Sequence, residues 1–545
     1  TPKNMAAPSP AKRGKTEKEC HVYIIPAKIQ KARLKVLIES AKRKGINIIS
    51  NFSEEVTHVV SEFESQEQVL SKLGVDSLAE DVIVVKTKWL SECLKAGCIV
   101  QVTDEHLVKV GSKEQGAKPM ESGNIPEYAC MRVNPLQHSN EDLVKALELL
   151  EEHAEFKEEY TRSLAFRRGA STLRSLPYQV TRIDQVQGLP HIGKHCEQVI
   201  QEVLEDGYSA EVESISTSSW FQSMKVLTNI YGIGPSTAKK WIAMGITSVA
   251  EALGHPDIQR KEDSRVAFGL AFYDDMNLPV TVKEMTYIKE CVLKEAERIL
   301  PGVTVEVTGG FRRGKQWGHD VDLLISHPEE GKEKGLLEQL LLRLNRQDMV
   351  LHGKLEHSTY AADVLQADMK GAYLRSTLDH FEKWIGVLKV KKTIRDSTCA
   401  PCTTDQAGQL SLSRQKAPEC DSTECEGNPG KTVDIDLPDA KLQLEKINSL
   451  SELVAVSHSK RDWYARRVDL IIAPASQYYY ALVGWTGSKH FNRSLRHYAQ
   501  RELNMKLTSH GLYDAGKKEA IPAYSEKGVF DNLKLPYKEP HERNC

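Results

Sequence analysis

The sequence lacks three features that mark specialised classes of protein. It has no apolar run of about 18 residues or more, so we expect no membrane-spanning helix. Its first twenty residues, TPKNMAAPSPAKRGKTEKEC, contain no apolar segment of the secretory type. Its eleven cysteines are odd in number and scattered, which argues against a disulfide framework and favours a reducing compartment.

A strong charge of either sign is also missing. The 73 Lys and Arg residues nearly balance the 75 Asp and Glu residues, which gives a formal net charge of −2. A nucleic-acid partner would therefore need basic residues gathered into patches. The short basic cluster Lys12, Arg13 and Lys15 fits a nuclear address or a solvated tail. With 545 residues, 40% of them hydrophobic, the chain predicts roughly three or four globular domains.

Four cysteines form the one cluster that needs its own interpretation. Their spacing, C-x2-C-x17-C-x4-C, is compatible with zinc. The surrounding sequence is polar and of low complexity, with no histidine and little to pack, which favours a disordered insertion over 395–430. The four are Cys399, Cys402, Cys420 and Cys425.

Residues 20–112 predict a small α/β domain. HVYIIP reads as a strand, ARLKVLIESAKRKG as an amphipathic helix, and DVIVVKTKWLSECLKAG as a strand followed by a helix. Trp89 begins that last helix, where a tryptophan can be a core residue or a family marker. Because no catalytic constellation occurs here, we expect this domain to bind a partner. Residues 113–138, rich in Gly, Pro and polar residues, predict a linker.

From residue 139 the pattern is helical, and it contains two similar turns. GLPHIGKHCEQVIQEVLEDG and LTNIYGIGPSTAKKWIAMGI each combine a helix end, a glycine turn and a new helix. Such turns expose backbone N–H groups at a helix N-terminus, which can grip DNA phosphates without reading bases. The second turn, with Gly232 and Gly234, fits best, although a simple packing turn between helices remains the alternative.

The stretch GGFRRGKQWGHDVDLLI predicts a metal-dependent nucleotide site. VDLLI reads as a buried strand, so Asp320 and Asp322 project to the same side, roughly 7 Å apart. Two such carboxylates repel unless a cation lies between them, and magnesium prefers oxygen ligands. A lone D-x-D also caps loops or pairs with surface arginines. Here, however, it follows a glycine turn and basic residues suited to phosphate, namely Gly309, Gly310, Arg313 and Lys315.

A third carboxylate supports the same interpretation. The apolar strand ARRVDLIIAP carries Asp469, and a charged residue in such a strand needs a reason. Joining the first two aspartates across a sheet would supply it. Three strand-borne carboxylates around two divalent ions form the arrangement for in-line displacement at phosphorus.

These motifs, in this order and with GWTGSKHFNRSLR after them, resemble the family X DNA polymerases over nearly the whole chain after residue 20. The resemblance implies a multidomain α/β and α+β fold: a BRCT domain, a helix-hairpin-helix domain, and fingers, palm and thumb with a mixed-sheet palm. Within it we expect the boundaries 1–19 tail, 20–112 BRCT, 113–138 linker, 139–227 first hairpin domain, 228–277 second hairpin, 278–475 palm and 476–545 nucleotide-selecting subdomain.

The resemblance also implies a role for each site residue. The metal ligands would be Asp320, Asp322 and Asp469, holding two Mg²⁺ ions or Mn²⁺ in their place. The nucleotide would contact Gly309, Gly310, Arg313, Lys315, His319, Gly484, Trp485 and Asn492. DNA would contact Gly232, Gly234, Lys389, Arg493 and Arg496, the last of which could also be a solvated helix arginine. The carbonyls of Thr228, Ile230 and Ile233 would hold Na⁺ or K⁺.

Several positions depart from parts of the family. Val199 stands where lyase-active relatives carry a Schiff-base lysine, so we expect no lyase activity, although Lys194 is near in sequence. Gly484 leaves the sugar 2′ position unblocked, so ribonucleotides should be accepted. Lys389 and the long segment HSTYAADVLQADMKGAYLRSTLDHF leave the degree of template dependence open, and Asn492 departs from the expected pattern.

The resemblance predicts a nuclear, monomeric enzyme that fills short gaps and bridges DNA ends in non-homologous end joining. Its substrates would be DNA ends, dNTPs and NTPs, and its N-terminal domain would bind Ku and the ligase IV complex. Two alternatives stay open. One is a terminal transferase that needs no template, and the other is a catalytically silent scaffold that binds DNA ends.

Overall fold

The computed structural model describes residues 20–108, 125–259, 264–358, 379–396 and 449–545. The chain divides into two compact units. The first comprises residues 1–226 and 234–247 together with residue 545, and the second residues 227–233 and 248–544. None of the helices among the described residues has the length and apolar character that a membrane span requires.

The first unit begins with an α/β domain, as predicted. Its sheet has the order β2-β1-β3-β4, and all three pairings are parallel. Trp89 of the last helix is fully buried, and its indole N–H donates to the Val100 carbonyl at 3.1 Å. Its elements are β1 (His21–Ile24), α1 (Lys31–Arg43), β2 (Asn47–Ile49), β3 (His58–Val60), α2 (Gln66–Leu73), β4 (Ile83–Val85) and α3 (Thr87–Ala96).

A helical domain follows in the same unit. Residues 125–138, predicted as part of a linker, instead belong to this fold: Arg132 is buried and donates to the hydroxyls of Thr172 and Ser171. The elements are η1 (Ala129–Met131), α4 (Glu141–Phe156), α5 (Tyr160–Arg174), η2 (Ile183–Gln185), α6 (Lys194–Asp206), α7 (Ala210–Ser216), α8 (Ser219–Thr228) and α9 (Pro235–Ala243).

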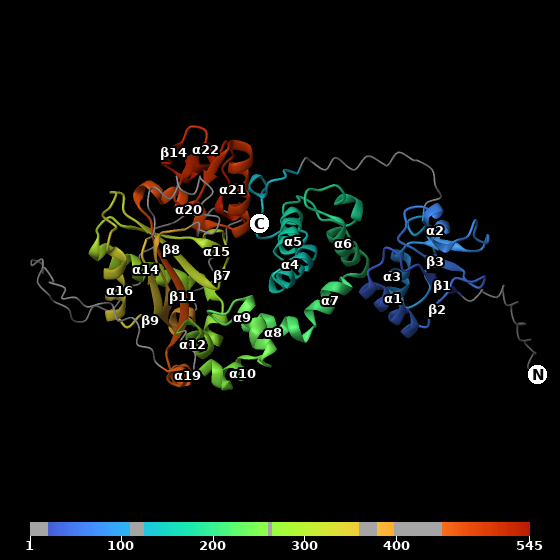
Figure 1. Cartoon of the computed structure of the whole chain (residues 1–545), viewed down its shortest axis with the longest axis horizontal. Helices are drawn as coiled ribbons and strands as arrows, with labels where there is room; N and C mark the ends of the chain where they lie inside the picture. Colours follow the sequence, from blue (N-terminus) through green and yellow to red (C-terminus); the bar gives the residue numbers. More distant parts are fainter. Residues whose placement is uncertain (1–19, 109–124, 260–263, 359–378, 397–448) are drawn as a thin grey trace, which may run out of the picture. The chain divides into compact units, whose positions relative to one another are not determined.

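The second unit is built on a five-stranded sheet of order β6-β8-β11-β10-β9 (Figure 1). β8 and β11 are parallel and the other pairings antiparallel, so the sheet is mixed, as predicted. The palm elements are β5 (Val280–Thr281), α14 (Val282–Ile299), β6 (Thr304–Val307), α15 (Gly309–Arg312), β7 (Trp317–Gly318), β8 (Asp320–Ser326), α16 (Leu336–Arg346), β9 (Val350–Glu356), β10 (Glu382–Lys391), α18 (Lys392–Asp396), α19 (Leu450–His458) and β11 (Trp463–Ile472).

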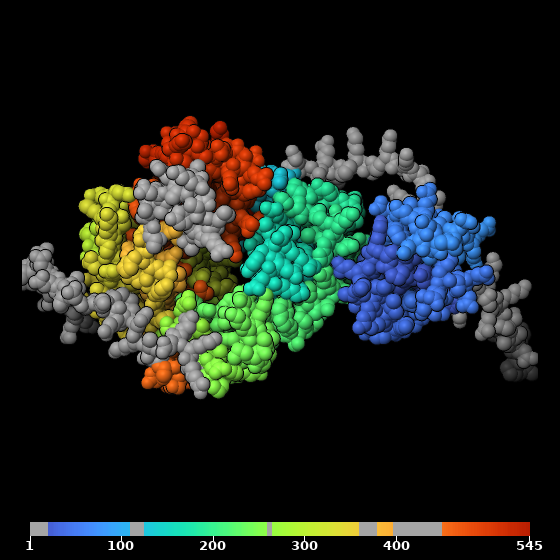
Figure 2. Space-filling view, viewed as in Figure 1, coloured from blue at the N-terminus to red at the C-terminus, as the bar shows by residue number. Residues whose placement is uncertain are grey.

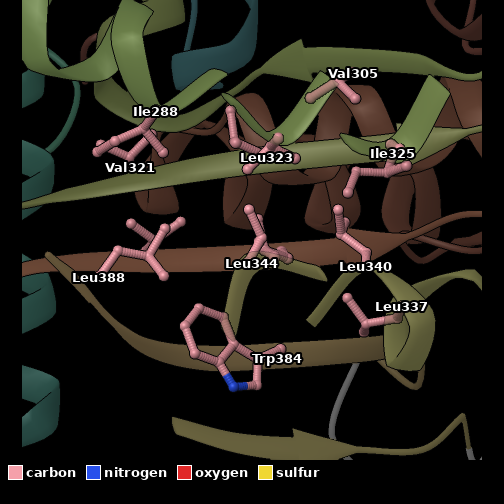
Figure 3. Packing of buried hydrophobic residues seen from close by; sticks show 14 of the residues in the cluster. Ile288, Val305, Val321, Leu323, Ile325, Leu337, Leu340, Leu344, Trp384 and Leu388 are labelled. Carbon is pink, nitrogen blue, oxygen red and sulfur yellow. The ribbon is translucent and has the colours of Figure 1, made fainter. Parts of the chain in front are cut away.

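One face of this sheet carries the main apolar core. Alternate residues of β8, Val321, Leu323 and Ile325, pack with α14 and α16, and Trp384 of β10 joins them (Figure 3). The leucines of α16 recur at helical spacing and are buried, which explains why this helix lies on the sheet. Because strand residues alternate, the other face of β8 presents Asp320, Asp322 and Leu324.

Short helices precede the palm, and a smaller subdomain follows it. In Figure 2 the C-terminal subdomain (red) lies against the palm (yellow), and α20 contacts β8. The preceding helices are α10 (Val249–Gly254), α11 (Pro256–Gln259), α12 (Ser264–Ala271) and α13 (Tyr273–Asn277). The C-terminal elements are η3 (Ala475–Gln477), α20 (Tyr478–Thr486), α21 (Lys489–Leu503), β12 (Met505–Leu507), β13 (Leu512–Asp514), β14 (Glu519–Ile521), α22 (Glu526–Asn532) and η4 (Pro540–Glu542).

Candidate active site

The three predicted aspartates lie on neighbouring strands of the palm. Asp469 of β11 is the register partner of Asp322 of β8, in a parallel pair where strands run about 4.8 Å apart. Asp320 lies two residues earlier on β8, on the same face. The fold therefore brings together residues separated by almost 150 positions, on the face opposite α14 and α16.

The closeness of the three aspartates raises the pKa values of two of them. Burial, reinforced by the charges of Asp320 and Asp469, raises the pKa of Asp322 to about 8. Burial and the charge of Asp320 raise the pKa of Asp469 to about 7. Nearby carboxylates raise one another's pKa because each disfavours the other's negative charge. The site is therefore short of positive charge.

The donor set fits a divalent cation. Asp469 Oδ1 is buried and has no hydrogen-bond partner among the described residues. A buried carboxylate oxygen without a partner costs free energy unless an ion or water satisfies it. Among the described residues no three such side chains converge closely enough to hold a metal as they stand. The unpartnered Oδ1 of Asp469 is therefore the observation that favours a cation at these three carboxylates.

The glycine turn is shaped around one of these carboxylates. Gly309 has φ +62°, and a Cβ there would overlap the Oδ2 atom of Asp322. The backbone N–H of Thr308 donates to the Asp322 carbonyl at 2.9 Å, which fixes the turn against β8. At Gly310 a Cβ would lie 3.1 Å from Cδ of Lys315. Glycine is thus required at 309 by backbone conformation and by the neighbouring carboxylate.

The basic residues of the turn are arranged differently from one another. Arg313 Nη1 donates to the Thr486 carbonyl at 2.5 Å, and its Nε donates to Asn544 at 3.1 Å. Lys315 and His319 are exposed. Arg313 therefore joins the turn to the C-terminal subdomain, whereas the side chains of Lys315 and His319 are exposed.

Sequence reasoning missed the partner of the neighbouring arginine. Arg312 forms a two-pronged pair with Glu526, at 2.8 and 2.9 Å, and buried Arg543 contacts the same carboxylate at 2.8 Å. Burial opposes the ionisation of Glu526, but hydrogen bonds and charge from these arginines outweigh it and lower its pKa to about 2. No local pattern links positions 312, 526 and 543; only the fold joins them.

Arg467 was also given no role, although it lies beside the aspartates. Its Nη2 lies 3.5 Å from Asp320 Oδ2. Its positive charge offsets part of the rise in the pKa of Asp322 and Asp469. Its position two residues before Asp469 on a strand places both on one face, so strand alternation could have identified it.

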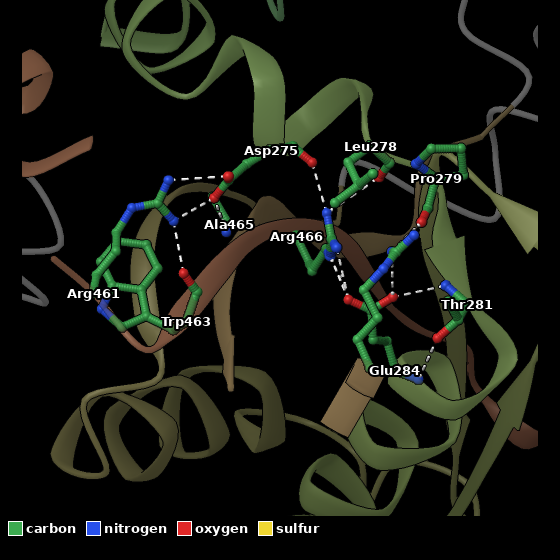
Figure 4. A network of polar contacts seen from close by, with 10 residues as sticks. Asp275, Leu278, Pro279, Thr281, Glu284, Arg461, Trp463, Ala465 and Arg466 are labelled. Carbon is green, nitrogen blue, oxygen red and sulfur yellow. Dashed lines mark hydrogen bonds and ion pairs between the residues drawn. The ribbon is translucent and has the colours of Figure 1, made fainter. Parts of the chain in front are cut away.

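The preceding arginine points to the opposite face and is anchored there. Arg466 Nη2 and Nε contact one oxygen of Glu284 at 2.7 and 2.8 Å, and both side chains are buried. Figure 4 shows Arg466 beside Glu284, and Arg395 reaches the other oxygen of Glu284 at 3.2 Å. Asp275 receives Arg461 and the backbone N–H of Ala465 in the same network. These contacts fix β11 against α13 and the start of α14, and with it the register of Asp469.

The residues of the C-terminal subdomain that were predicted to contact the nucleotide make packing and hydrogen-bond contacts within the protein. A Cβ at Gly484 would lie 2.6 Å from Ser509 Oγ, so glycine is needed here for close packing. Asn492 is buried, and its amide donates to the Gly484 carbonyl at 2.6 Å. Trp485 packs against the cluster around Leu324. Asn492 is thus tied to α20 rather than open on a surface.

The predicted DNA contacts differ in exposure. Arg493 of α21 is exposed, whereas Arg496 on the same helix is half-buried, and that burial lowers its pKa. Lys389 pairs with Asp348 at 2.7 Å and lies over the Trp463 ring at 5.4 Å. The register partner of Lys389 on β11 is Ala465, whereas that of Asp469 on β10 is Ile385. Lys389 therefore lies further along the sheet than the aspartates.

The glycine turns lie between helices, as expected. In the second turn Gly232 has φ +91°, and the Ile233 N–H donates to the Ile230 carbonyl at 3.0 Å. Gly234 directly precedes α9, and Thr228 is the last residue of α8. Cation binding by the carbonyls of this turn stays a prediction. In the helical domain Val199 of α6 is buried in the apolar core, and Lys194, the first residue of α6, is exposed.

Several predictions fall outside the described residues. These are the basic tail, the first part of the linker, most of the long segment after His357, and the four-cysteine cluster. They stay predictions.

Comparison with known families and proteins gives a consistent result. Four family profiles match: a helix-hairpin-helix domain at residues 138–209, the fingers domain of DNA polymerase lambda at 225–277, the DNA polymerase beta palm at 280–401 and the DNA polymerase beta thumb at 481–544. These profiles begin at residue 138, so the BRCT assignment of residues 20–112 stays a prediction.

Relatives of known activity match along almost the whole chain. DNA-directed DNA/RNA polymerase mu of Homo sapiens is 34% identical over 96% of this chain and 94% of its own. DNA nucleotidylexotransferase of Xenopus laevis is 32% identical over 97% of this chain and 94% of its own. The nucleotidylexotransferase of Homo sapiens is 31% identical over 96% of this chain and 93% of its own.

Proposed function

Because this chain belongs to the family X DNA polymerases, we propose that it fills short gaps and joins bridged ends in non-homologous end joining, as a polymerase of the mu type. The observation that carries the proposal is the register of Asp469 with Asp322, beside a glycine turn that a side chain would block. A catalytically silent scaffold would have no need to keep three carboxylates in this costly arrangement.

The chain's own residues bind and orient the substrates. The turn at Gly309 and Gly310 lets a triphosphate approach the backbone, while Arg313 and Lys315 supply charge to its oxygens. Arg313 is already fixed to Thr486 and Asn544, so its guanidinium loses little freedom when phosphate arrives. His319, which precedes Asp320 and is exposed, would contact the primer end.

Asp320, Asp322 and Asp469 would hold two Mg²⁺ ions, with Mn²⁺ as a substitute. When bound, such ions lower the pKa of a primer 3′-hydroxyl and neutralise the leaving pyrophosphate. The raised pKa values of Asp322 and Asp469 mean that cation binding must release protons from these carboxyls at neutral pH. A further cation, monovalent (Na⁺ or K⁺), would bind the carbonyls of the second hairpin.

The same proposal extends to the choice of sugar and of partners. Gly484 lacks a side chain that could exclude a 2′-hydroxyl, so ribonucleotides should be used readily. The parallel sheet and buried Trp89 of the N-terminal domain support a BRCT-type docking module, which would bind Ku and the ligase IV complex. The protein would act as a nuclear monomer, without lyase activity because Val199 is a buried aliphatic residue.

A terminal transferase is the second candidate. Nucleotidylexotransferases match almost as well as polymerase mu, at 32% against 34% identity. Lys389 also stands at a position where the resemblance to the transferase favours untemplated addition. The two candidates share the same catalytic centre, so they differ in how much template they require.

Primer extension with Mg²⁺ distinguishes the candidates. The substrates are a single-stranded primer, a one-nucleotide gap, and two ends with short complementary overhangs, each with dNTPs and with NTPs. Asp469→Ala protein is the control for contaminating activity. Extension of gaps and bridged ends, with little on single strands, is the expected result.

Strong extension of the single-stranded primer would move the protein to the transferase. No extension by the unaltered protein, with DNA binding retained, would leave only the scaffold.

A further inference from the structure

The second hairpin, predicted to grip the DNA backbone, is in contact with the catalytic carboxylates through two side chains. Tyr231 lies in the turn between α8 and α9. The guanidinium carbon of Arg467 lies over the Tyr231 ring, 5.2 Å from its centroid. The same guanidinium reaches Asp320 at 3.5 Å. Hairpin, arginine and carboxylate are therefore consecutive members of one chain of contacts.

The turn itself is rigidly seated. A Cβ at Gly269 of α12 would lie 2.5 Å from the Tyr231 carbonyl oxygen, so helix and turn touch backbone to backbone. A Cβ at Gly232 would meet the side chains of Arg265 and Val266 at 3.2 Å. Phe268 of α12 belongs to an apolar cluster with Val387 and Ala465 of the palm sheet, and Tyr231 borders this cluster. The position of the Tyr231 ring is thus set by the packing of α12 on the sheet.

Arg467, by contrast, is held by few directional contacts. Its Nε is buried without a hydrogen-bond partner among the described residues, and its pair with Asp320 is long at 3.5 Å. Arg466, one residue earlier, is clamped by hydrogen bonds to Glu284 and two carbonyls. For Arg467 the aromatic face is therefore a main constraint on where the guanidinium lies. A cation over an aromatic ring gains about 0.5–1 kcal/mol where exposed, and more where desolvated.

We propose that Tyr231 is a positioning residue: its ring, fixed in the turn of the second hairpin, holds Arg467 beside Asp320 and so sets the place of a cation beside the catalytic carboxylates. The inference rests on the proposed polymerase function. Because the turn is seated on α12, the ring presents a fixed face to Arg467 and keeps the positive charge in place at the site.

Two substitutions at one position separate the ring from the rest of the side chain. Tyr231→Phe keeps the aromatic face, and we expect kcat for gap filling to stay within about twofold of the unaltered protein. Tyr231→Leu removes the face, and we expect kcat to fall about three- to tenfold. The KM for dNTP and the Kd for fluorescein-labelled gapped DNA should change less than about twofold, because the ring would act on the reaction step.

A double-mutant cycle tests whether the effect passes through the arginine. In the Arg467→Ala background, Tyr231→Leu should have no further effect on kcat, since the group it positions is gone. Tyr464→Leu is the matched control, because Tyr464 lies under Arg466 at 4.7 Å on the other face of the same strand. This control loses a comparable contact, and we expect its kcat to be unchanged.

Other outcomes would overturn the inference. Additive effects in the cycle, equal losses for Tyr231→Phe and Tyr231→Leu, or a change confined to DNA affinity would each show that Tyr231 does not act through Arg467. In all three cases the unaltered protein still extends primers, so the proposed function stands. Failure of the unaltered protein to extend any primer would overturn that function, and this inference with it.

Discussion

The two faces of β11 bury charge in opposite ways. On the face toward α14, Arg466 meets Glu284, whose other oxygen receives Arg395, so every buried charge has a close partner. On the opposite face Asp469 stands beside Asp322, and its Oδ1 has no partner among the described residues. Arg466 and Asp469 are three residues apart on one strand, yet one group is neutralised and the other is left with excess negative charge.

The paired face fixes the position of the strand, whereas the carboxylate face is suited to binding a cation. A fully paired buried network specifies one position for the strand, and breaking one partner is costly. A group of carboxylates with too little positive charge is costly in itself and becomes favourable only when a cation arrives. In β11 the paired network of Arg466 fixes the strand that carries Asp469, and so keeps the carboxylates in register.

The largest expected effect comes from the cation-binding face. Asp469→Asn keeps the shape of the side chain but removes one negative charge that a cation needs. We expect kcat for gap filling to fall by roughly 1,000-fold or more. Circular dichroism and DNA binding should be unchanged, since no described residue hydrogen-bonds Asp469 Oδ1. Retained activity would show that this carboxylate is not part of the reaction.

Breaking the structural face should affect stability first. Arg466→Leu leaves Glu284 buried with Arg395 as its remaining cationic partner among the described residues, which we expect to cost about 3 kcal/mol of the free energy of unfolding. The measurement is urea denaturation followed by tryptophan fluorescence. Adding Glu284→Gln should recover part of the loss, because the unpaired charge is then gone. A stable single variant would mean that the network does not hold β11.

The glycine turn gives a matched pair of substitutions. Gly309→Ala places a Cβ on the Asp322 carboxylate at a positive φ, and we expect kcat to fall about 100-fold through displacement of that group. Gly310→Ala meets only the flexible side chain of Lys315, at 3.1 Å, and should cost much less. Steady-state kinetics on a one-nucleotide gap compares them. Equal losses would place the requirement in the turn as a whole.

The smallest predicted effect is a pH dependence of stability without metal. The folded-state pKa values of Asp322 (about 8) and Asp469 (about 7) lie above the ordinary value of 3.8. The folded protein therefore keeps protons that the unfolded chain has lost, so stability falls as pH rises from about 4 to 8. In EDTA, Asp322→Asn should raise the Tm relative to the unaltered protein at pH 8.5.

At pH 5 the same pair of proteins should have nearly equal Tm values, because Asp322 is then protonated in the folded state. Any acid-side change common to both proteins belongs to other groups, such as Glu526, whose pKa of about 2 gives stability that is lost as pH falls below its ordinary value of 4.5. An equal Tm difference at both pH values would contradict the raised pKa of Asp322.

Local patterns were sufficient for much of the fold. Strand alternation in VDLLI and RRVDLII placed the aspartates on one face, and the structure has both segments as neighbouring parallel strands. Composition was less reliable at residues 125–138, where a proline-containing segment expected to be linker packs because Arg132 finds hydroxyl partners on α5. Whether a polar side chain is buried depends on partners that lie elsewhere in the chain.

By itself, the sequence determined the chemistry available at the site: three strand-borne carboxylates, a turn that needs glycine, and basic residues beside it. Only the tertiary structure decided which charges meet. It paired Arg466 with Glu284, Arg312 with Glu526, and Arg467 with the ring of Tyr231. The physical reason is that secondary structure follows from neighbours along the chain, whereas electrostatic energy depends on distance in space.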